Sequence, residues 1–184
     1  MERIFLNKNH NLWLLFLPIL LSVASLLSFT AMAQASTSAT VTSTVTVQNV
    51  SVSVSSGTVS YGTLTTGASM STLAAPGLAD TQTVTNTGNV AEDFTIKGQN
   101  SANWTLDTTN STLDHYIHKF CPASCGTNAS PTNFTALTTS YAALGSGNVA
   151  ANGTQTFDLQ ITTPQTSDVF TSQSVDVTVL ASAH

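Results

Sequence analysis

The sequence predicts an all-β protein, an antiparallel β-sandwich of about eight or nine short strands. Three observations favour this fold class. Valines and aromatic residues alternate with serines and threonines in short runs, which is the pattern of strands with one buried face. Clusters of Gly, Asn, Pro and Ser separate these runs. No amphipathic helix pattern follows the apolar run that ends at Phe29.

Residues 1–33 have the organisation of a signal peptide. Basic residues precede an apolar run from Leu12 to Phe29, and Ala31-Met32-Ala33 is the small-x-small pattern that signal peptidases accept. We therefore predict cleavage after Ala33 and a secreted, extracellular or cell-surface location. The apolar run is also just long enough to span a bilayer, so an uncleaved anchor is the alternative. After cleavage no contact with the membrane is expected.

Residues 34–39 are expected to form a flexible segment, and residues 40–184 a single β-sandwich domain. The first predicted strand is Thr40–Val54. Its first three valines occupy odd positions and its last three occupy even positions, so the alternation of apolar residues changes phase inside the segment. Side chains of one strand alternate with a period of two, so a bulge, a break or a crossing between sheets is required at Gln48-Asn49.

The next segments are shorter. Val59 and Tyr61 predict a brief strand, and Thr65–Leu78 has the composition of a loop. Thr81–Thr85 and Phe94–Lys97 are separated by Asn86-Thr87-Gly88-Asn89, whose residues tolerate positive φ. This arrangement predicts a β-hairpin.

The second half continues the β pattern with one ambiguity. Leu113–Phe120 alternates as a strand should, although Ser111 or Thr112 is able to cap a short helix; we favour the strand. Phe134–Leu144 has a mixed pattern with a partly helical period. Phe157–Ile161 and the valines of Val175–Val179 alternate as strands.

Large apolar side chains on the inward positions of these runs form the predicted core. Its members are Phe94, Ile96, Trp104, Phe157, Leu159, Ile161, Val175 and Val177. Trp104 is the only tryptophan after the predicted cleavage site, and we expect it to fill the centre of the core. An exposed platform that stacks on a ligand is the alternative for this residue.

The charge balance excludes some partners. After cleavage only Lys97 and Lys119 are basic, against eight acids: Asp80, Glu92, Asp93, Asp107, Asp114, Asp158, Asp168 and Asp176. Nucleic acids and anionic membranes are bound by basic patches, and this sequence has none. About a third of the residues after Ala33 are Ser or Thr, so hydroxyl groups must solvate most of the surface.

Two stretches resemble a known family. Val84–Ile96, with its Asn86-Thr87-Gly88-Asn89 turn, and Val149–Ile161 resemble a hairpin and a later turn-and-strand of secreted prokaryotic immunoglobulin-like domains, the CARDB-like group. The resemblance implies an immunoglobulin-like sandwich that serves as an extracellular adhesion or spacer module. The insert from Trp104 to Leu144 is not part of the usual pattern of that group.

Cys121 and Cys125 are the only cysteines, and an exported chain with an even pair predicts a disulfide. Together with His115 and His118, the two cysteines also offer the four nitrogen and sulfur ligands that zinc prefers, but on a strand His115 and Cys121 share one face and His118 lies on the other. Asp107 and Asp114 flank one loop and offer oxygen ligands to calcium, without EF-hand spacing. We expect solvated turn residues there, and no metal or other cofactor.

No catalytic motif stands out. Gly145-Ser146-Gly147 is a turn and not a nucleophile elbow, and no histidine adjoins a nucleophile motif. The sequence therefore predicts a non-catalytic surface protein with a structural or adhesive role, such as a self-assembling appendage or matrix subunit. Its expected partners are copies of itself or cell-surface components. The alternative is an extracellular module that binds carbohydrate or protein, with Tyr61, Tyr116 and Tyr141 as candidate contacts.

One segment bears directly on assembly. The run Ala39–Val47, with Val41, Val45 and Val47 on one face, is able to pair with an open sheet edge of a neighbouring subunit. The alternative is that it forms the first strand of its own sandwich. The sequence alone favours this second interpretation.

Overall fold

A computed structural model describes residues 38–184. The predicted signal peptide, 1–33, and most of the 34–39 segment lie outside the described residues. The chain divides into two units after Val45, and every described strand lies in the second unit, Thr46–His184. No helix of the described residues is long and apolar enough to cross a membrane.

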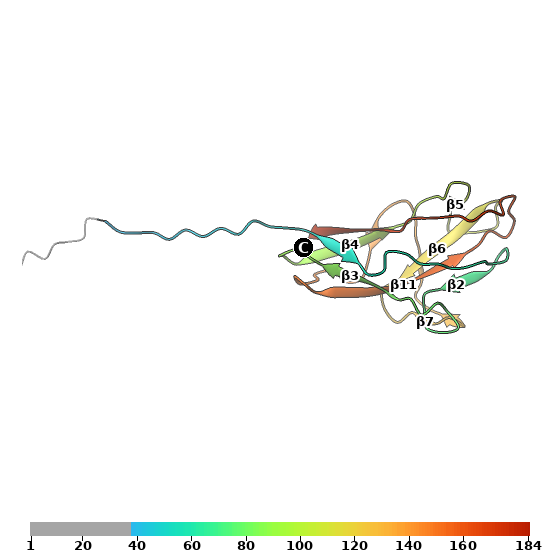
Figure 1. Ribbon diagram of the computed structural model, residues 1–184, viewed down its shortest axis with the longest axis horizontal. Helices are drawn as coiled ribbons and strands as arrows, with labels where there is room; N and C mark the ends of the chain where they lie inside the picture. Colours follow the sequence, from blue (N-terminus) through green and yellow to red (C-terminus); the bar gives the residue numbers. More distant parts are fainter. Residues whose placement is uncertain (1–37) are drawn as a thin grey trace, which may run out of the picture. The chain divides into compact units, whose positions relative to one another are not determined.

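The described residues contain twelve strands and no helix, which confirms the predicted all-β class. The strands are labelled in Figure 1. They are β1 (Val52–Val54), β2 (Ser69–Ser71), β3 (Gln82–Asn86), β4 (Glu92–Lys97), β5 (Thr105–Leu106), β6 (His115–Cys121), β7 (Gly126–Thr127), β8 (Ser130–Pro131), β9 (Thr135–Ala136), β10 (Ala142–Ala143), β11 (Thr154–Thr162) and β12 (Thr178–Ala183). Several have only two residues, so the count exceeds the predicted eight or nine.

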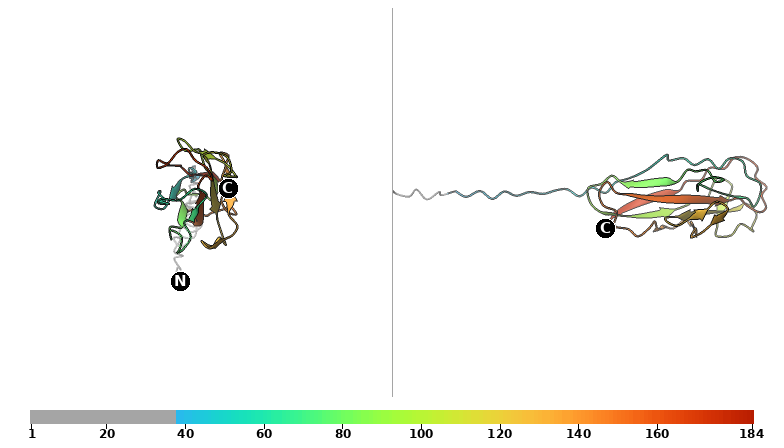
Figure 2. Two further views of the ribbon diagram at one scale, coloured as in Figure 1. Left: turned by 90° about the vertical axis from the view of Figure 1, so that its right-hand side faces the viewer. Right: turned by 90° about the horizontal axis from the view of Figure 1, so that it is seen from below.

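Three sheets contain these strands. The largest has the order β1-β3-β11-β6-β5, with β2 added beside β11 and β9 beside β6. A second sheet has the order β10-β4-β12, and β7 and β8 form a small hairpin. All pairs are antiparallel except β5 and β6, which are parallel. In Figure 2 the strands of the two larger sheets are aligned along roughly the same axis, with arrows that point both ways along it.

The two larger sheets share one hydrophobic core. Strands β3 and β4 alternate strictly between buried and partly buried residues, so each presents one face to this core. The buried cluster consists of Val84, Phe94, Ile96, Phe120, Leu137, Leu144, Phe157 and Leu159. Burying each such side chain stabilises the fold by about 1.5–3 kcal/mol.

The predicted hairpin of residues 81–97 is wrong, because β3 and β4 lie in different sheets. The turn residues reverse the chain but carry it from one sheet to the other. Asn86 is fully buried; its Nδ2 donates to the carbonyls of Val90 and Val149 at 2.7 and 2.9 Å, and its Oδ1 accepts from the Gly88 amide. These bonds fix the conformation of the loop that carries the chain from β3 in one sheet to β4 in the other.

The predicted first strand, Thr40–Val54, is shorter in the structure. Only Val52–Val54 pairs, with β3, and residues 38–51 contain no strand. The parity break coincides with a contact at Asn89: its Oδ1 accepts from the Asn49 amide at 2.7 Å, and its Nδ2 donates to the Val47 carbonyl at 2.8 Å. Asn89 therefore fixes the backbone where the alternation changes phase.

Candidate binding groove

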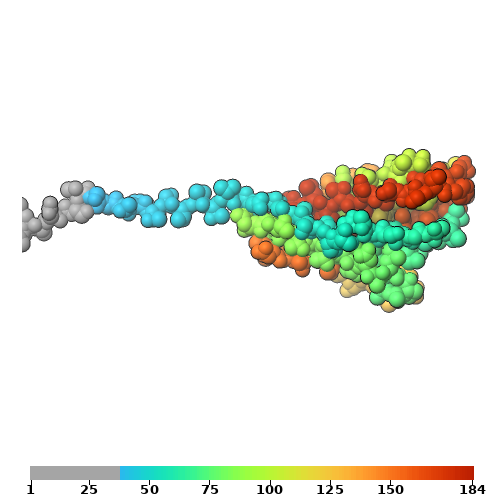
Figure 3. All heavy atoms as spheres, viewed as in Figure 1, coloured from blue at the N-terminus to red at the C-terminus, as the bar shows by residue number. Residues whose placement is uncertain are grey.

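A groove of about 1170 Å³ opens between two extended segments, residues 57–64 and residues 170–177. The first segment follows β1, and the second leads into β12. Figure 3 shows the two segments on one face of the molecule, the first in teal and the second in red. Phe157, Leu159 and Ile161 of β11 contribute apolar side chains to the groove.

Both flanking segments look like strands but have no partners. Val59 and Tyr61 are partly buried between exposed neighbours, and Val175 and Val177 alternate in the same way. The sequence predicted strands at both places. The strand at Val59–Tyr61 is absent, and the last strand begins only at Thr178. Within the described residues, no backbone–backbone hydrogen bond involves residues 57–64 or 170–177.

His118 reaches the groove from the buried face of β6. Its Nε2 lies 3.0 Å from the Tyr61 hydroxyl, and the two rings meet edge to face with centroids 5.8 Å apart. The Nδ1 atom is buried without a hydrogen-bond partner in the described part of the chain. Burial lowers the pKa of His118 to about 4, so the imidazole is neutral at physiological pH. Burial, and secondarily the charge of Asp80, raises the pKa of Tyr61.

Trp104 also lines the groove. The side chain is partly buried, at the edge of the core and not in the central cluster, and its ring centroid lies 6.1 Å from that of Tyr116. Its Nε1 is a second buried polar atom without a hydrogen-bond partner among the described residues. An indole N–H can only donate, so only a hydrogen-bond acceptor is able to satisfy this atom.

The other predicted core residues occupy different depths. Phe94, Ile96, Phe157 and Leu159 belong to the central cluster. Ile161 is buried and lines the groove. Val175 and Val177 are partly buried in one groove wall, before the start of β12.

The three candidate contact tyrosines are placed differently. Tyr116 is fully buried, and its hydroxyl donates to the Gln99 carbonyl, so it is not available to a ligand. Tyr141 is exposed, and the Lys97 ammonium lies 4.8 Å from its ring centroid. Tyr61 is the candidate that lines the groove.

The residues considered as metal ligands do not converge. His115 Nδ1 lies 2.8 Å from Asp107 Oδ2, and this hydrogen bond is the main reason that the pKa of Asp107 is lowered. Asp114 Oδ1 accepts from the Ser167 hydroxyl and the Asp168 amide. His118 lies on the opposite face of β6 from His115. Among residues 38–184, no group of three or more His, Cys, Asp or Glu side chains is placed to hold a metal ion.

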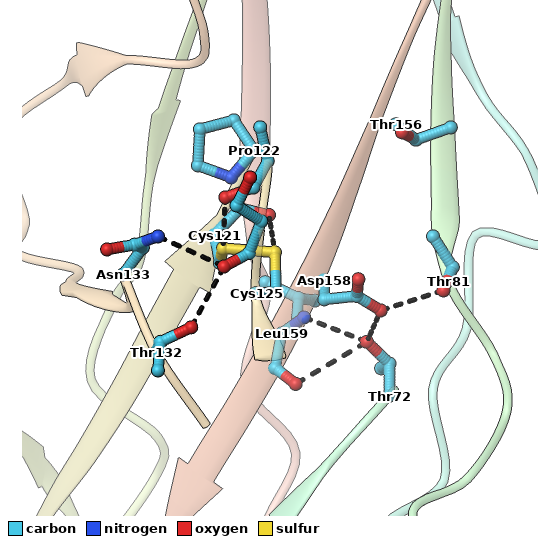
Figure 4. Close-up of a disulfide and its surroundings, with 12 residues drawn as sticks. Thr72, Thr81, Cys121, Pro122, Cys125, Thr132, Asn133, Thr156, Asp158 and Leu159 are labelled. Carbon is cyan, nitrogen blue, oxygen red and sulfur yellow. Dashed lines mark hydrogen bonds between the residues drawn. A yellow bond between two sulfur atoms is a disulfide. The ribbon is translucent and has the colours of Figure 1, made fainter. Parts of the chain in front are cut away.

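Cys121 and Cys125 form a disulfide with an S–S distance of 2.14 Å. Figure 4 shows the bond beside the end of β6, where Thr132 and Asn133 side chains donate to the Ser124 carbonyl within the bridged loop. The disulfide closes a short loop, joins no two sheets and does not line the groove.

The candidate assembly strand has three of the four large apolar side chains of the described residues that are at least 80% exposed, the fourth being Phe170 at 85%. Val41, Val45 and Val47 have exposed fractions of 90, 91 and 80%. Thr42, Thr44 and Thr46 alternate with them along the chain. We refer to residues 41–47 as the valine segment. A fully exposed row of valines with an opposite row of threonines is the pattern of a strand that has no sheet.

Searches of family models, of curated proteins and of solved structures found no match to this chain. The assignment of a function therefore depends on the geometry of the groove and of the valine segment. Sequence analysis identified the valine segment but not the groove. The available signal was the alternation at Val59–Tyr61 and Val175–Val177; nothing in the sequence indicated that these two runs leave a gap between them.

Proposed function

We propose that this protein is a non-catalytic structural or adhesive subunit of an extracellular surface, built as an immunoglobulin-like sandwich of the kind it resembles, and that it assembles with copies of itself. The observation that carries the proposal is the exposure of Val41, Val45 and Val47, each at least 80%. An exposed row of β-branched residues associates with other β structure unless something covers it.

Energetics favour association through this segment. Burying one valine side chain is worth about 1.5–3 kcal/mol, and three lie on the same face of an extended segment. Backbone hydrogen bonds along a sheet edge add to this contribution and fix the register. The free energy lost in ordering seven residues opposes it, so the assembly depends on all three valines.

The surface chemistry supports close packing of copies. Residues 38–184 contain two lysines and eight acids, and hydroxyl side chains cover much of the remaining surface. With so few charges, copies that pack side by side meet little electrostatic repulsion. The Cys121–Cys125 disulfide suits an oxidising, extracellular location.

The histidines support a non-catalytic role. His115 pairs with Asp107, His184 pairs with Asp93 at 2.8 Å, and His118 bonds to Tyr61. Within residues 38–184, none of these three makes a hydrogen bond to a serine, threonine or cysteine side chain, which is the contact that would activate a nucleophile.

Assembly is tested on the full chain expressed in a host that exports it. The exported protein is purified from the medium or the cell surface and observed by negative-stain electron microscopy and light scattering across a concentration series. We expect filaments or a growing average mass. A monodisperse monomer at the highest concentration would contradict the proposal.

A second candidate function is favoured by the aromatic lining of the groove. Trp104 and Tyr61 both line it, and an aromatic ring beside an unsatisfied N–H is a common arrangement for contacting a sugar. The second candidate is an extracellular carbohydrate-binding module. A glycan array probed with the exported protein tests it: binding that is lost in Trp104→Ala supports it, and an array without signal removes it.

A further inference from the structure

We propose that the groove is the acceptor for the valine segment of a second copy of this chain, whose residues 41–47 enter between segments 57–64 and 170–177 as the missing strand. This inference rests on the proposed function and specifies the partner and the contact surface. Four properties of the described residues support it.

The first property is length. The valine segment has seven residues, and each flanking segment has eight. At roughly 3.3 Å per residue, an extended stretch of seven spans about 23 Å. Gly57 and Gly62 have left-handed φ angles of 69° and 70°, so the first flank runs without such an interruption only from Thr58 to Tyr61. The inserted strand is therefore expected to pair with the first flank over these residues and with the second flank over a longer stretch.

The second property is the supply of backbone hydrogen bonds. Exposed and partly buried positions alternate over 58–62 in the first flank and over 172–177 in the second, yet neither flank makes a backbone–backbone bond within residues 38–184. An inserted strand provides donors and acceptors to both edges at once. The backbone N–H and C=O groups of the two flanking segments then acquire the hydrogen-bond partners that they lack.

The third property is the match of side chains. Odd positions of the valine segment present Val41, Ser43, Val45 and Val47, whereas the even positions are all threonines. The groove offers Phe157, Leu159 and Ile161 as apolar contacts. With the odd face inward, the valines meet these side chains and the threonines remain in water.

The fourth property is that the groove-lining residues hold two of the three buried side-chain polar atoms that lack hydrogen-bond partners in the described residues, the third being Glu92 Oε2. Trp104 Nε1 and His118 Nδ1 both belong to groove-lining residues. A buried donor or acceptor without a partner costs about 1–3 kcal/mol. Ser43 is the one polar residue on the inward face of the valine segment, and its hydroxyl can accept the hydrogen bond that Trp104 offers.

A second copy is a better donor than the same chain. Asn89 holds the Val47 carbonyl and both backbone polar groups of Asn49, and no turn or bend lies between Thr46 and Ser51. Val47 and Asn49 of each chain are thus already engaged by Asn89 of their own domain, and the residues after them lead directly into β1. Because each copy carries one donor and one acceptor, the contact is head-to-tail and extends into a linear filament.

The test compares Val45→Asp, which places a carboxylate on the inward face, with the matched control Thr44→Asp, which places it on the outward face. Both are made in the full chain, exported and purified. We expect Val45→Asp to yield monomers and Thr44→Asp to assemble like the parent. At concentrations low enough to keep both variants monomeric, they should melt at the same temperature, because neither residue lies in a strand of the domain.

A peptide of residues 40–49 tests the groove separately from assembly. Added to Val45→Asp monomers, it should bind and change the emission of Trp104, the one tryptophan after the predicted cleavage site. A peptide carrying Val45→Asp should bind at least roughly tenfold more weakly, since about 1.4 kcal/mol of burial is lost. A peptide carrying Thr44→Asp should bind within about twofold of the parent.

Failures of the two proposals give different results. If the parent never assembles, the proposed function is wrong, whereas peptide binding to the groove still reports on the acceptor. If the parent assembles but Val45→Asp assembles equally well, or if the peptide leaves Trp104 emission unchanged, the valine segment is not the strand that fills this groove and the inference is overturned.

Discussion

Tyr61 and His118 are joined by a hydrogen bond of 3.0 Å between the phenol oxygen and imidazole Nε2, across 57 positions of the sequence. This contact ties segment 57–64, which has no strand partner, to β6 of the largest sheet. It also leaves His118 nearly fully buried, with Nδ1 unpaired. A charged imidazolium at this site would have to be desolvated without any carboxylate partner.

The stability of the protein should therefore depend on pH through His118. Its pKa is about 4 in the folded protein and about 6.5 in an unfolded chain. Above pH 6.5 both states are neutral and the contribution of His118 is complete. As the pH falls from 6.5 to 4, only the unfolded chain takes up the proton, so the free energy of unfolding falls by about 3 kcal/mol. Urea denaturation at half-unit pH intervals measures this slope.

His118→Gln is the control for this prediction, because it removes the titrating group and keeps a polar side chain. The variant should be less stable at pH 7 but nearly flat between pH 6.5 and 4. Tyr61→Phe should keep the slope, since burial and not the tyrosine is the cause of the lowered pKa. An unchanged slope in His118→Gln would show that another group is responsible.

Local patterns predicted the secondary structure better than the pairing. The alternation of Phe94 and Ile96 indicated a strand with an inward face, and both are buried in the core. The Asn86–Asn89 turn was recognised as a reversal, but turn residues do not determine whether the chain returns to the same sheet or crosses to the other. That choice depends on bonds from buried Asn86 to Val90 and Val149, and the second of these is 63 positions away.

The groove is harder to predict for a similar reason. Val59–Tyr61 and Val175–Val177 each have the composition of a strand, and a sequence pattern cannot show that no neighbour lies beside them. Trp104 illustrates the limit: a lone tryptophan predicts a core position, whereas the structure places it at the edge of the core and in the groove lining.

Thr72 should contribute to stability through its hydroxyl. The residue is fully buried; Oγ1 donates to Asp158 Oδ1 at 2.8 Å and accepts from the Leu159 amide at 2.9 Å. Figure 4 shows this network, which Thr81 joins through the same carboxylate. Thr72→Val keeps the shape but removes the side-chain acceptor of the Leu159 amide and one of the two donors to the Asp158 carboxylate, and should cost about 2–3 kcal/mol. Thr72→Ser keeps the hydroxyl and should cost about 1 kcal/mol in chemical denaturation. Equal stability of the two variants would contradict this account.

The Cys121–Cys125 disulfide should have a modest effect on stability. It closes a loop with a sequence separation of four, for which chain entropy predicts about 2 kcal/mol. The double variant Cys121→Ala/Cys125→Ala should lose about this amount in urea denaturation, and should keep its groove, because neither residue lines it. Intact mass after alkylation without reductant should be unchanged, and should rise by two adducts after reduction in denaturant. Modification of the native, unreduced protein would show that the cysteines are free.

Asn86 should be one of the polar residues whose substitution lowers the stability of the protein most. Its side chain holds the connection between the two larger sheets through two donated bonds and one accepted bond, and it is fully buried. Asn86→Ala removes the side-chain partners of the Val90 carbonyl and the Gly88 amide. It also removes one of the two donors to the Val149 carbonyl, which keeps the Glu92 amide, so we expect a loss of about 3 kcal/mol. Thr85→Ala is the matched control. The Thr85 side chain makes no hydrogen bond to the described residues, and its substitution should cost no more than about 0.5 kcal/mol of stability.

Thermal and urea denaturation of the two variants distinguish a specific role of the Asn86 amide from a general effect of substitutions in β3. If both cost the same, the crossing between sheets does not depend on Asn86, and the Asn49–Asn89 contacts must fix it instead.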